Sequence, residues 1–346
     1  MQTRDLKYLL AYLVPLSAAF SLIEKGLFSW TTVALVFGLI PFLELVSPRS
    51  TYNFPPEVEQ SRAHAAFFDW MLYLNAPILF LLVGGYLWVV TRADVSLMEW
   101  IGLTLSTGIV VGANGINVAH ELGHRSHSGE QHLAKLMLLP ALYQHFFVEH
   151  NFGHHKNVAT DLDPASAKKG EVVFAFWFKS VIGGWLSAWK LEKERLQKKG
   201  QRVWGLQNQM IRFTVFQLSW LFSIWVLFDW NGLVGAIAIA TIGFLLLETV
   251  NYLEHYGLRR KKLASGHFEP VSPAHSWNSD HEIGRILLYE LTRHSDHHYK
   301  STRKYQVLRH MDESPQLPFG YPTSVLLCLM PPLWFAIMDK RLNQSN

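Results

Sequence analysis

The chain of 346 residues has a single cysteine, Cys328, and charged residues make up only 17% of it. One thiol cannot form an internal disulfide, a zinc site built from cysteines or an iron–sulfur cluster. Lysine and arginine number 31 against 27 acidic residues, a net charge of +4, and no arginine-rich run lies beside stacking aromatic residues. The sequence therefore excludes a disulfide scaffold and predicts no nucleic-acid partner.

Charge is scarce because apolar residues are concentrated in long blocks. A helix needs about 20 apolar residues to cross the ~30 Å hydrocarbon core of a membrane. Six blocks qualify, each with at most an occasional charge, at residues 8–23, 28–46, 69–90, 97–119, 211–230 and 232–253. Two shorter stretches, 133–148 and 323–338, contain prolines or polar residues and predict interfacial or buried helices. We therefore expect an all-α, polytopic membrane protein with six transmembrane helices, forming one domain over residues 1–346.

Basic residues are unevenly divided between the loops of this arrangement. Twelve lie between residues 120 and 210 and four more at 259–262, whereas the turn at 230–232 has none. Short loops rich in lysine and arginine stay in the cytoplasm. We therefore expect an inner-membrane protein whose helical cap, residues 120–210 and 254–346, faces the cytoplasm. The first apolar block is not followed by a small-residue cleavage site, which predicts a retained span. The aromatic segment 171–197 predicts a helix that lies along the membrane surface, with its lysines toward water or lipid headgroups, or that packs within the cytoplasmic cap.

Histidine is abundant, with 17 residues, and nine of them cluster beside the predicted span ends. Three clusters have helical spacings of three or four residues, and a single histidine closes the sixth block. The nine are His120, His124, His150, His154, His155, His255, His294, His297 and His298. Neutral imidazole is the commonest protein metal ligand and suits iron, zinc, copper and nickel. Nine donors exceed the needs of one tetrahedral zinc and favour two metals with open positions, although the spacing does not name the element.

One of the clusters also matches a protease motif. The sequence from His120 to His124 fits H-E-x-x-H, in which two histidines bind zinc and Glu121 would be the general base. An intramembrane zinc protease would use one further ligand and leave most of the other histidines without a role. A polytopic metal transporter, whose histidines handle metal in transit, is the alternative outside enzymes. The number of clustered histidines favours a two-metal enzyme over both.

The histidine clusters resemble those of a known family, the integral-membrane, non-haem di-iron alkane 1-monooxygenases. The family patterns H-E-L-x-H, E-H-x-x-G-H-H and L-x-R-H-S-D-H-H match residues 120–124, 149–155 and 291–298. Residues 251–258, Asn-Tyr-Leu-Glu-His-Tyr-Gly-Leu, match a further box that separates alkane hydroxylases from other desaturase-like enzymes, and the run 275–279 also fits. Arg125 stands where lysine is common in the family. The resemblance extends over nearly the whole chain.

This resemblance implies an activity and a set of partners. It implies that the nine histidines bind two iron ions that react with O2 as co-substrate. The substrate would be a linear medium-chain alkane that enters from the bilayer and leaves as a 1-alkanol. Two electrons would come from a separate rubredoxin, itself served by a rubredoxin reductase, because the four cysteines of a fused rubredoxin are absent. A fatty-acyl desaturase or hydroxylase of the same superfamily is the alternative.

Other residues are candidates for supporting the reaction. The acids that flank the histidines could orient their free N–H groups, and these are Glu121, Glu149, Glu254 and Asp296. His275 and His281 precede the third cluster and could do the same. Counting back from His120 by four, seven and eleven residues reaches Ile116, Ala113 and Ile109, which we expect on one helix face near the substrate. Phe37, on the second span, is a candidate for setting the depth of the substrate channel.

Overall fold

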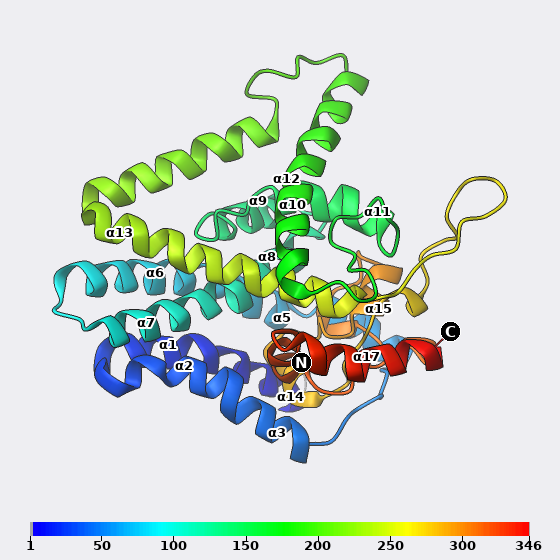
Figure 1. Ribbon diagram of the computed structural model, residues 1–346, viewed down its shortest axis with the longest axis horizontal. Helices are drawn as coiled ribbons and strands as arrows, with labels where there is room; N and C mark the ends of the chain where they lie inside the picture. The colour runs from blue at the N-terminus through cyan, green and yellow to red at the C-terminus, as the bar shows by residue number, and fades with distance from the viewer. Residues whose placement is uncertain (1–2, 346) are drawn as a thin grey trace.

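The computed structural model describes residues 3–345, with side chains for residues 3–343. Within that range every regular element is a helix and no strand occurs, which confirms the all-α prediction. Long helices run side by side through one half of the molecule, and short helices and loops gather around α15 (His294–Tyr299) at the other end (Figure 1). The long helices are apolar, whereas the second half contains most of the clustered histidines.

Five helices are long and apolar enough to cross a membrane: Thr3–Glu24, Gly26–Val46, Ala66–Arg92, Leu97–Gly123 and Gln209–His255. Several of them are composite. The first joins η1 (Thr3–Tyr12) and α1 (Leu13–Glu24), and the third joins α5 (Ala66–Tyr73) and α6 (Asn75–Arg92). The second consists of η2 (Gly26–Trp30), α2 (Thr31–Ala34), the π-helical η3 (Leu35–Leu39) and α3 (Ile40–Val46). The fourth consists of α7 (Leu97–Val110), the π-helical η4 (Val111–Ile116) and α8 (Asn117–Gly123).

The fifth of these helices, α13 (Gln209–His255), holds both of the last two expected spans in one element of 47 residues. It is broken at Asp229, whose φ of 53° and ψ of −160° are not helical, and its two arms fold back on each other (Figure 1). The Asp229 carboxylate caps the second arm by accepting a hydrogen bond of 2.8 Å from the Asn231 backbone N–H. A side chain at Gly232 would clash with Phe228, which explains the glycine at this tight reversal.

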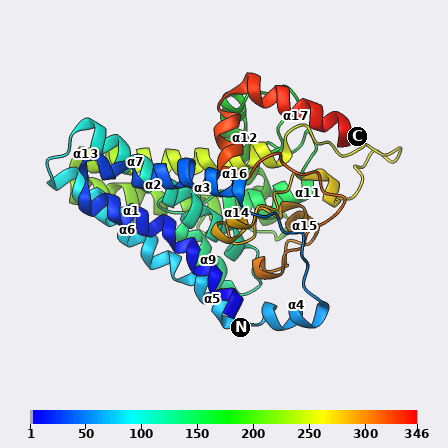
Figure 2. The same ribbon diagram turned by 90° about the horizontal axis from the view of Figure 1, so that it is seen from below.

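The remaining helices are shorter, apart from α12 with its 26 residues, and most of them lie in the half that contains the histidines (Figure 2). They are α4 (Pro56–Ala63), α9 (Ser128–Met137), α10 (Phe146–Glu149), η5 (His150–His154), α11 (His155–Asn157), α12 (Val173–Lys198), η6 (Pro273–His275), α14 (Glu282–Leu287), α15, η7 (Tyr305–Val307), α16 (Tyr321–Cys328) and α17 (Pro331–Ser345). As expected, neither 133–148 nor 323–338 forms a helix long enough to cross a membrane. Turning the molecule by 90° shows that α12, α16 and α17 lie together on one side of this half (Figure 2).

Small residues allow the fourth long helix to approach α13 closely. A Cβ atom added to Gly108 would lie 2.6 Å from the Ile242 side chain, and one added to Gly243 would lie 2.6 Å from Val111. Such separations are too short for real side chains, so the two helices approach to a distance that only glycine permits. This contact fixes the position of α8, and therefore of His120, relative to the end of α13 that carries His255.

Candidate metal centre and substrate cavity

The nine clustered histidines converge on two adjoining points in the fold. The first group consists of His120, His124, His150, His155 and His297, and the second of His154, His255, His294 and His298. Within each group the candidate ligand nitrogens all lie within 4.8 Å of one another. The groups draw on helices far apart in the sequence, so the fold and not the local spacing brings them together.

A π-helical turn divides one cluster between the two groups. In an α-helix, His150 and His154 would share a face, as their spacing of four residues suggests. The segment His150–His154 is instead π-helical, with a wider turn and i→i+5 hydrogen bonds. His150 therefore pairs with His155, their Nε2 atoms 3.1 Å apart, while His154 turns to the second group and approaches His298 at 3.2 Å.

Within each group, the ring nitrogens point toward one another. The Nε2 atom of His120 lies 2.8 Å from that of His297, and the Nε2 atom of His294 lies 2.9 Å from that of His298 and 3.2 Å from that of His255. Burial lowers the pKa of His150, His155, His294, His297 and His298 well below the ordinary value of histidine. These rings are therefore neutral, and converging neutral imidazoles are a donor set that fits a transition metal in each group.

Asp163 orients one of these histidines from outside the groups. Its Oδ2 atom lies 2.9 Å from Nδ1 of His154, and the Ser166 hydroxyl donates to the same oxygen at 2.5 Å. Burial disfavours a charged His154, but the Asp163 carboxylate outweighs this effect and raises its pKa to about 9. A carboxylate on Nδ1 fixes the ring so that Nε2 faces the metal position. Sequence analysis missed Asp163, because nothing in the sequence separates it from the exposed Asp161 two residues earlier.

The four acids expected to support the histidines occupy different environments. Only Glu254 contacts a nitrogen that faces a metal position, with Oε2 at 3.2 Å from Nε2 of His294, while its Oε1 accepts a hydrogen bond from the Tyr321 hydroxyl at 2.7 Å. Glu149 lies against α12, 3.4 Å from the Ser187 hydroxyl. Burial raises the pKa of Glu149 to about 8, with a further contribution from Asp163.

Glu121 and Asp296 are held by cations instead. Glu121 forms an ion pair of 2.8 Å with Arg125 and accepts a hydrogen bond from the Tyr305 backbone N–H. Asp296 pairs with Arg303 at 3.2 Å and Arg309 at 3.0 Å. These two acids connect the histidine helices to neighbouring segments. Glu121 is therefore not free to act as the general base that the H-E-x-x-H motif would require.

The segment before the third cluster supports the centre mainly through residues other than His275 and His281. Asn278 accepts hydrogen bonds from the Ser295 backbone N–H and hydroxyl at 2.8 and 2.9 Å, which anchors the first turn of α15. The backbone carbonyl of His275, and not its ring, lies 3.4 Å from Nδ1 of His255. The ring of His281 contacts the backbone carbonyl of Glu44 instead.

An apolar cavity with an accessible volume of about 100 Å³ opens beside the two groups. Its walls come from η3, the fourth long helix, the end of α13 and α16, and His120, His150 and His294 form its polar end together with Glu254. A concave, largely apolar site with a few convergent polar groups is the usual form of a small-molecule site. A chain-like apolar molecule bound here would have one end at the histidines and would otherwise touch mainly apolar side chains.

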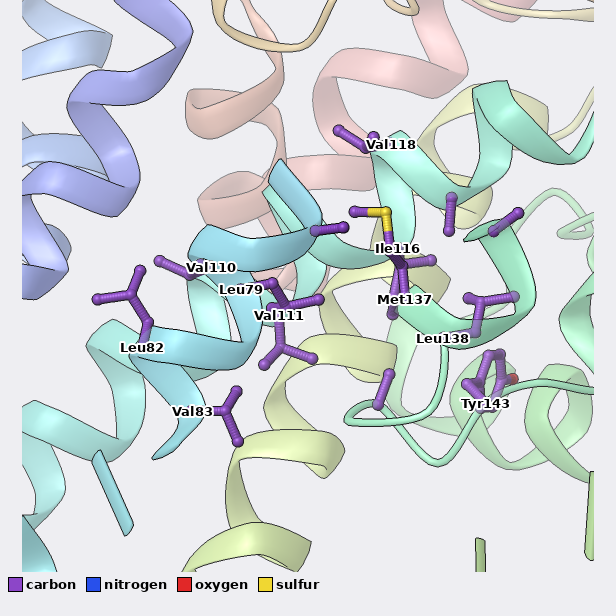
Figure 3. Packing of buried hydrophobic residues seen from close by; sticks show 14 of the residues in the cluster. Leu79, Leu82, Val83, Val110, Val111, Ile116, Val118, Met137, Leu138 and Tyr143 are labelled. Carbon is purple, nitrogen blue, oxygen red and sulfur yellow. The ribbon is translucent and has the colours of Figure 1, made fainter. Parts of the chain in front are cut away.

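Three of the four expected substrate-contacting residues line this cavity, namely Phe37, Ile109 and Ala113. The structure does not bring Ile116 to it. Ile116 is fully buried in the apolar core, among the residues drawn in Figure 3 with Met137 and Leu79. Ile116 lies at the junction of the π-helical segment Val111–Ile116 with α8, and its side chain packs into the core on the other side of the helix. Asn117, three residues before His120, lines the cavity instead.

The comparisons with known proteins agree with this geometry. The family model described as fatty acid desaturase matches residues 94–324. The alkane 1-monooxygenase of Pseudomonas putida is 36% identical over 322 residues, which are 93% of this chain and 80% of the relative. Alkane 1-monooxygenase 2 of Pseudomonas aeruginosa is 39% identical over 90% of this chain and 83% of its own length.

A relative that is named for different substrates is less similar in sequence. The hydroxylase component of xylene/toluene monooxygenase from Pseudomonas putida is 29% identical over 95% of this chain and 87% of its own length. The family match covers the helices that carry all nine histidines, and the alkane 1-monooxygenases align over most of both chains. The chain therefore belongs to the fatty acid desaturase family and, within it, to the alkane 1-monooxygenases, which are oxidoreductases.

Proposed function

We propose that this protein hydroxylates the terminal carbon of linear medium-chain alkanes, with O2 and two electrons from rubredoxin, at a pair of irons held by the nine histidines. The observation that carries the proposal is the contact between the apolar cavity and both histidine groups, since His120 and His150 belong to the first and His294 to the second. Iron bound by the histidines would supply the oxygen activation that a terminal C–H bond requires.

The chain's own residues account for substrate position. An alkane offers no hydrogen-bonding group, so its orientation depends on the shape of the cavity and on apolar contact alone. Phe37, Ile109 and Ala113 contribute walls along the cavity, while the histidines and Glu254 close one end. A chain threaded into such a site presents its terminal carbon to the metal positions.

We propose that the chain crosses the inner membrane six times, with the histidine half as a cytoplasmic cap of a single domain. A straight helix of 47 residues would be about 70 Å long, more than twice the hydrocarbon thickness. The break at Asp229 divides α13 into two crossings. The basic loops before and after these two crossings then lie on the same side of the membrane. Exposed apolar residues of α12, such as Phe178, Ile182 and Trp185, favour its position along the membrane surface.

We propose that rubredoxin docks in an open groove on the outer side of the cap. Exposed Lys156 and Lys190 line the groove together with Arg259, and Asp163, which binds His154, lies at its base. The groove therefore gives a short path from the surface to the second histidine group. The neighbouring Arg260 donates to the backbone carbonyls of Lys156 and Glu269 and has a structural role.

Charge reversal tests this docking site. Changing Lys156 and Lys190 together to glutamate is expected to raise the KM for reduced rubredoxin roughly tenfold at low salt, with little change in kcat, because rim charges act mainly on encounter. The matched control is Lys199→Glu at the exposed end of α12, outside the groove. Equal KM values in the double variant and the control would contradict docking of rubredoxin in this groove.

A single-turnover experiment tests the proposed function as a whole. Purified protein with its iron counted is reduced without oxygen, then mixed with O2 and octane. About one molecule of 1-octanol per two irons is expected. Formation of an unsaturated product from a fatty-acyl substrate, with no alkanol from octane, would favour the desaturase alternative. A single tightly held zinc without O2 consumption would favour the protease.

A further inference from the structure

A second, much smaller cavity, with an accessible volume of about 10 Å³ that is close to the need of one water molecule, adjoins the histidine groups and has a different character. Its lining includes His145, Glu149, Glu248 and Ser180, so much of its wall is polar. Phe146, His150 and Asn251 line both cavities and therefore form the partition between them. The metal centre thus has an apolar compartment and a polar compartment on different sides of one partition.

Glu248 is the acid that α13 contributes to the polar cavity. It lies seven residues before His255, and only 3% of its surface is exposed. Its Oε1 accepts a hydrogen bond from the Tyr143 hydroxyl at 2.8 Å, and its Oε2 accepts one from the Asn251 amide at 3.2 Å. A carboxyl group buried in a membrane-crossing helix is costly, and such residues commonly mark ion or proton pathways. Glu248 is not needed as a ligand, because the nine histidines form the two groups without it.

His145 indicates what occupies this cavity. It is 7% exposed, and its Nε2 has no hydrogen-bond partner among the described residues, while its ring packs edge-on against Tyr143 at 4.3 Å. Burial lowers the pKa of His145 to about 4, so the ring is neutral. A buried polar atom that lines a polar cavity and lacks a protein partner is normally satisfied by water.

The reaction itself creates a need for such a compartment. Each monooxygenation breaks the O–O bond, inserts one oxygen atom into a C–H bond and reduces the other to water. The balance is RH + O2 + 2e⁻ + 2H⁺ → ROH + H2O, so two protons enter and one water leaves for every alkanol. The electrons come from the donor protein. The walls of the apolar cavity are mostly apolar, and bound substrate would exclude water from it.

We propose that the polar cavity holds a water molecule on the proton route to the metal centre and that Glu248 carries protons along this route. This inference rests on the proposed function, which supplies the demand for protons. Cavity water protonates the Glu248 carboxylate, and the neutral carboxyl then releases the proton to water on the side of the histidines. Two such cycles accompany each alkanol. Tyr143 and Asn251 hold the carboxyl in place through both states.

The outer end of this route lies at α12. Pro164 lines both the polar cavity and the open groove of the cap, and α12 contributes Gly184 to the cavity and Gly183 to the groove. A Cβ atom on Gly183 would lie 2.8 Å from that of Pro164. The loop that carries Pro164 therefore approaches α12 more closely than any residue other than glycine would allow. Pro164 and the contacting turn of α12 therefore lie between the polar cavity and the open groove.

The substitution Glu248→Gln tests the proposal, because it keeps the size of the side chain and one acceptor oxygen but cannot exchange a proton. Turnover is expected to fall roughly 10²-fold with iron content unchanged, and the solvent deuterium isotope effect on turnover is expected to rise. Glu248→Asp, which retains a carboxyl group, is expected to recover part of the rate. The matched control is Glu44→Gln, another carboxyl buried in a membrane-crossing helix but outside both cavities, which should leave the isotope effect unchanged.

A second measurement does not depend on alkane oxidation. Infrared difference spectra of the enzyme between its oxidised and reduced states are expected to contain a protonated-carboxyl band that shifts in D2O and is absent from Glu248→Gln. Because no alkane is added, this band tests the proton route even if the substrate proposed above is wrong. Unchanged turnover and isotope effect in Glu248→Gln, loss of its iron, or a band that survives the substitution would each overturn the proposal.

Discussion

Replacing His255 by alanine is expected to remove one metal of the two and to abolish alkane hydroxylation. His255 belongs to the group of four histidines, in which its Nε2 lies 3.2 Å from that of His294. Three remaining imidazoles would hold iron weakly, whereas the group of five is untouched. Even residues outside the ligand set typically change metal affinity 10- to 100-fold. We expect iron per protein to fall from about two to about one and turnover to fall at least ~10²-fold.

The control for this experiment is His281→Ala. His281 is also buried, but its ring contacts the Glu44 carbonyl and belongs to neither group. That variant is expected to keep two irons and most of its activity. If His255→Ala also retained two irons after dialysis against a chelator, the division of the histidines into two separate metal sites would be wrong.

Enlarging Ala113 is expected to change which alkanes are oxidised. Ala113 lines the apolar cavity along with Ile109 and Phe37, so Ala113→Leu places three more carbon atoms in the space available to substrate. Burial of one methylene contributes about 0.8 kcal/mol, so displacing three costs roughly 2.4 kcal/mol, or about 50-fold in relative preference. We expect the ratio of short- to long-chain alkanols from a mixture of alkanes to rise by about this factor.

Ile116 offers a matched control on the same helix. It is buried in the core and does not line the cavity, so Ile116→Leu, which conserves volume, is expected to leave the product ratio unchanged at a small cost in stability. Product ratios measured on membranes with mixed alkanes separate the two variants. A shift caused by Ile116→Leu and not by Ala113→Leu would show that the substrate lies on the other face of the helix.

Much of this architecture follows from patterns that extend over many residues. The long helices are evident from apolar blocks that only a membrane or a large core can bury, and the nine histidines from their spacing at predicted helix ends. Both signals are strong because each is repeated several times along the chain. The division of the nine histidines into groups of five and four was not predictable in the same way, since it depends on how distant helices meet.

Local departures from α-helical geometry account for the other differences. The periodicity of Val111–Ile116 and of His150–His154 is that of a π-helix, and one additional residue per turn rotates every side chain beyond it. This rotation separated His150 from His154, whereas Ala113 and Ile109 still line the cavity. No residue type in these segments predicts the wider π-helical turn, because tertiary packing stabilises this turn.

The roles of the acids were the least predictable feature. Glu121 and Asp296 precede or follow histidines in sequence, yet both are held by arginines, whereas Asp163, nine residues from its partner His154, holds the ring. Which carboxylate reaches an imidazole depends on the path of the loops that connect the helices. A sequence position beside a ligand therefore says little about contact with it.

The most direct test of the account is anomalous scattering at the iron edge from the purified, iron-loaded protein. The account predicts two peaks, one within His120, His124, His150, His155 and His297 and the other within His154, His255, His294 and His298. A single peak, or a peak outside these two groups, would contradict it.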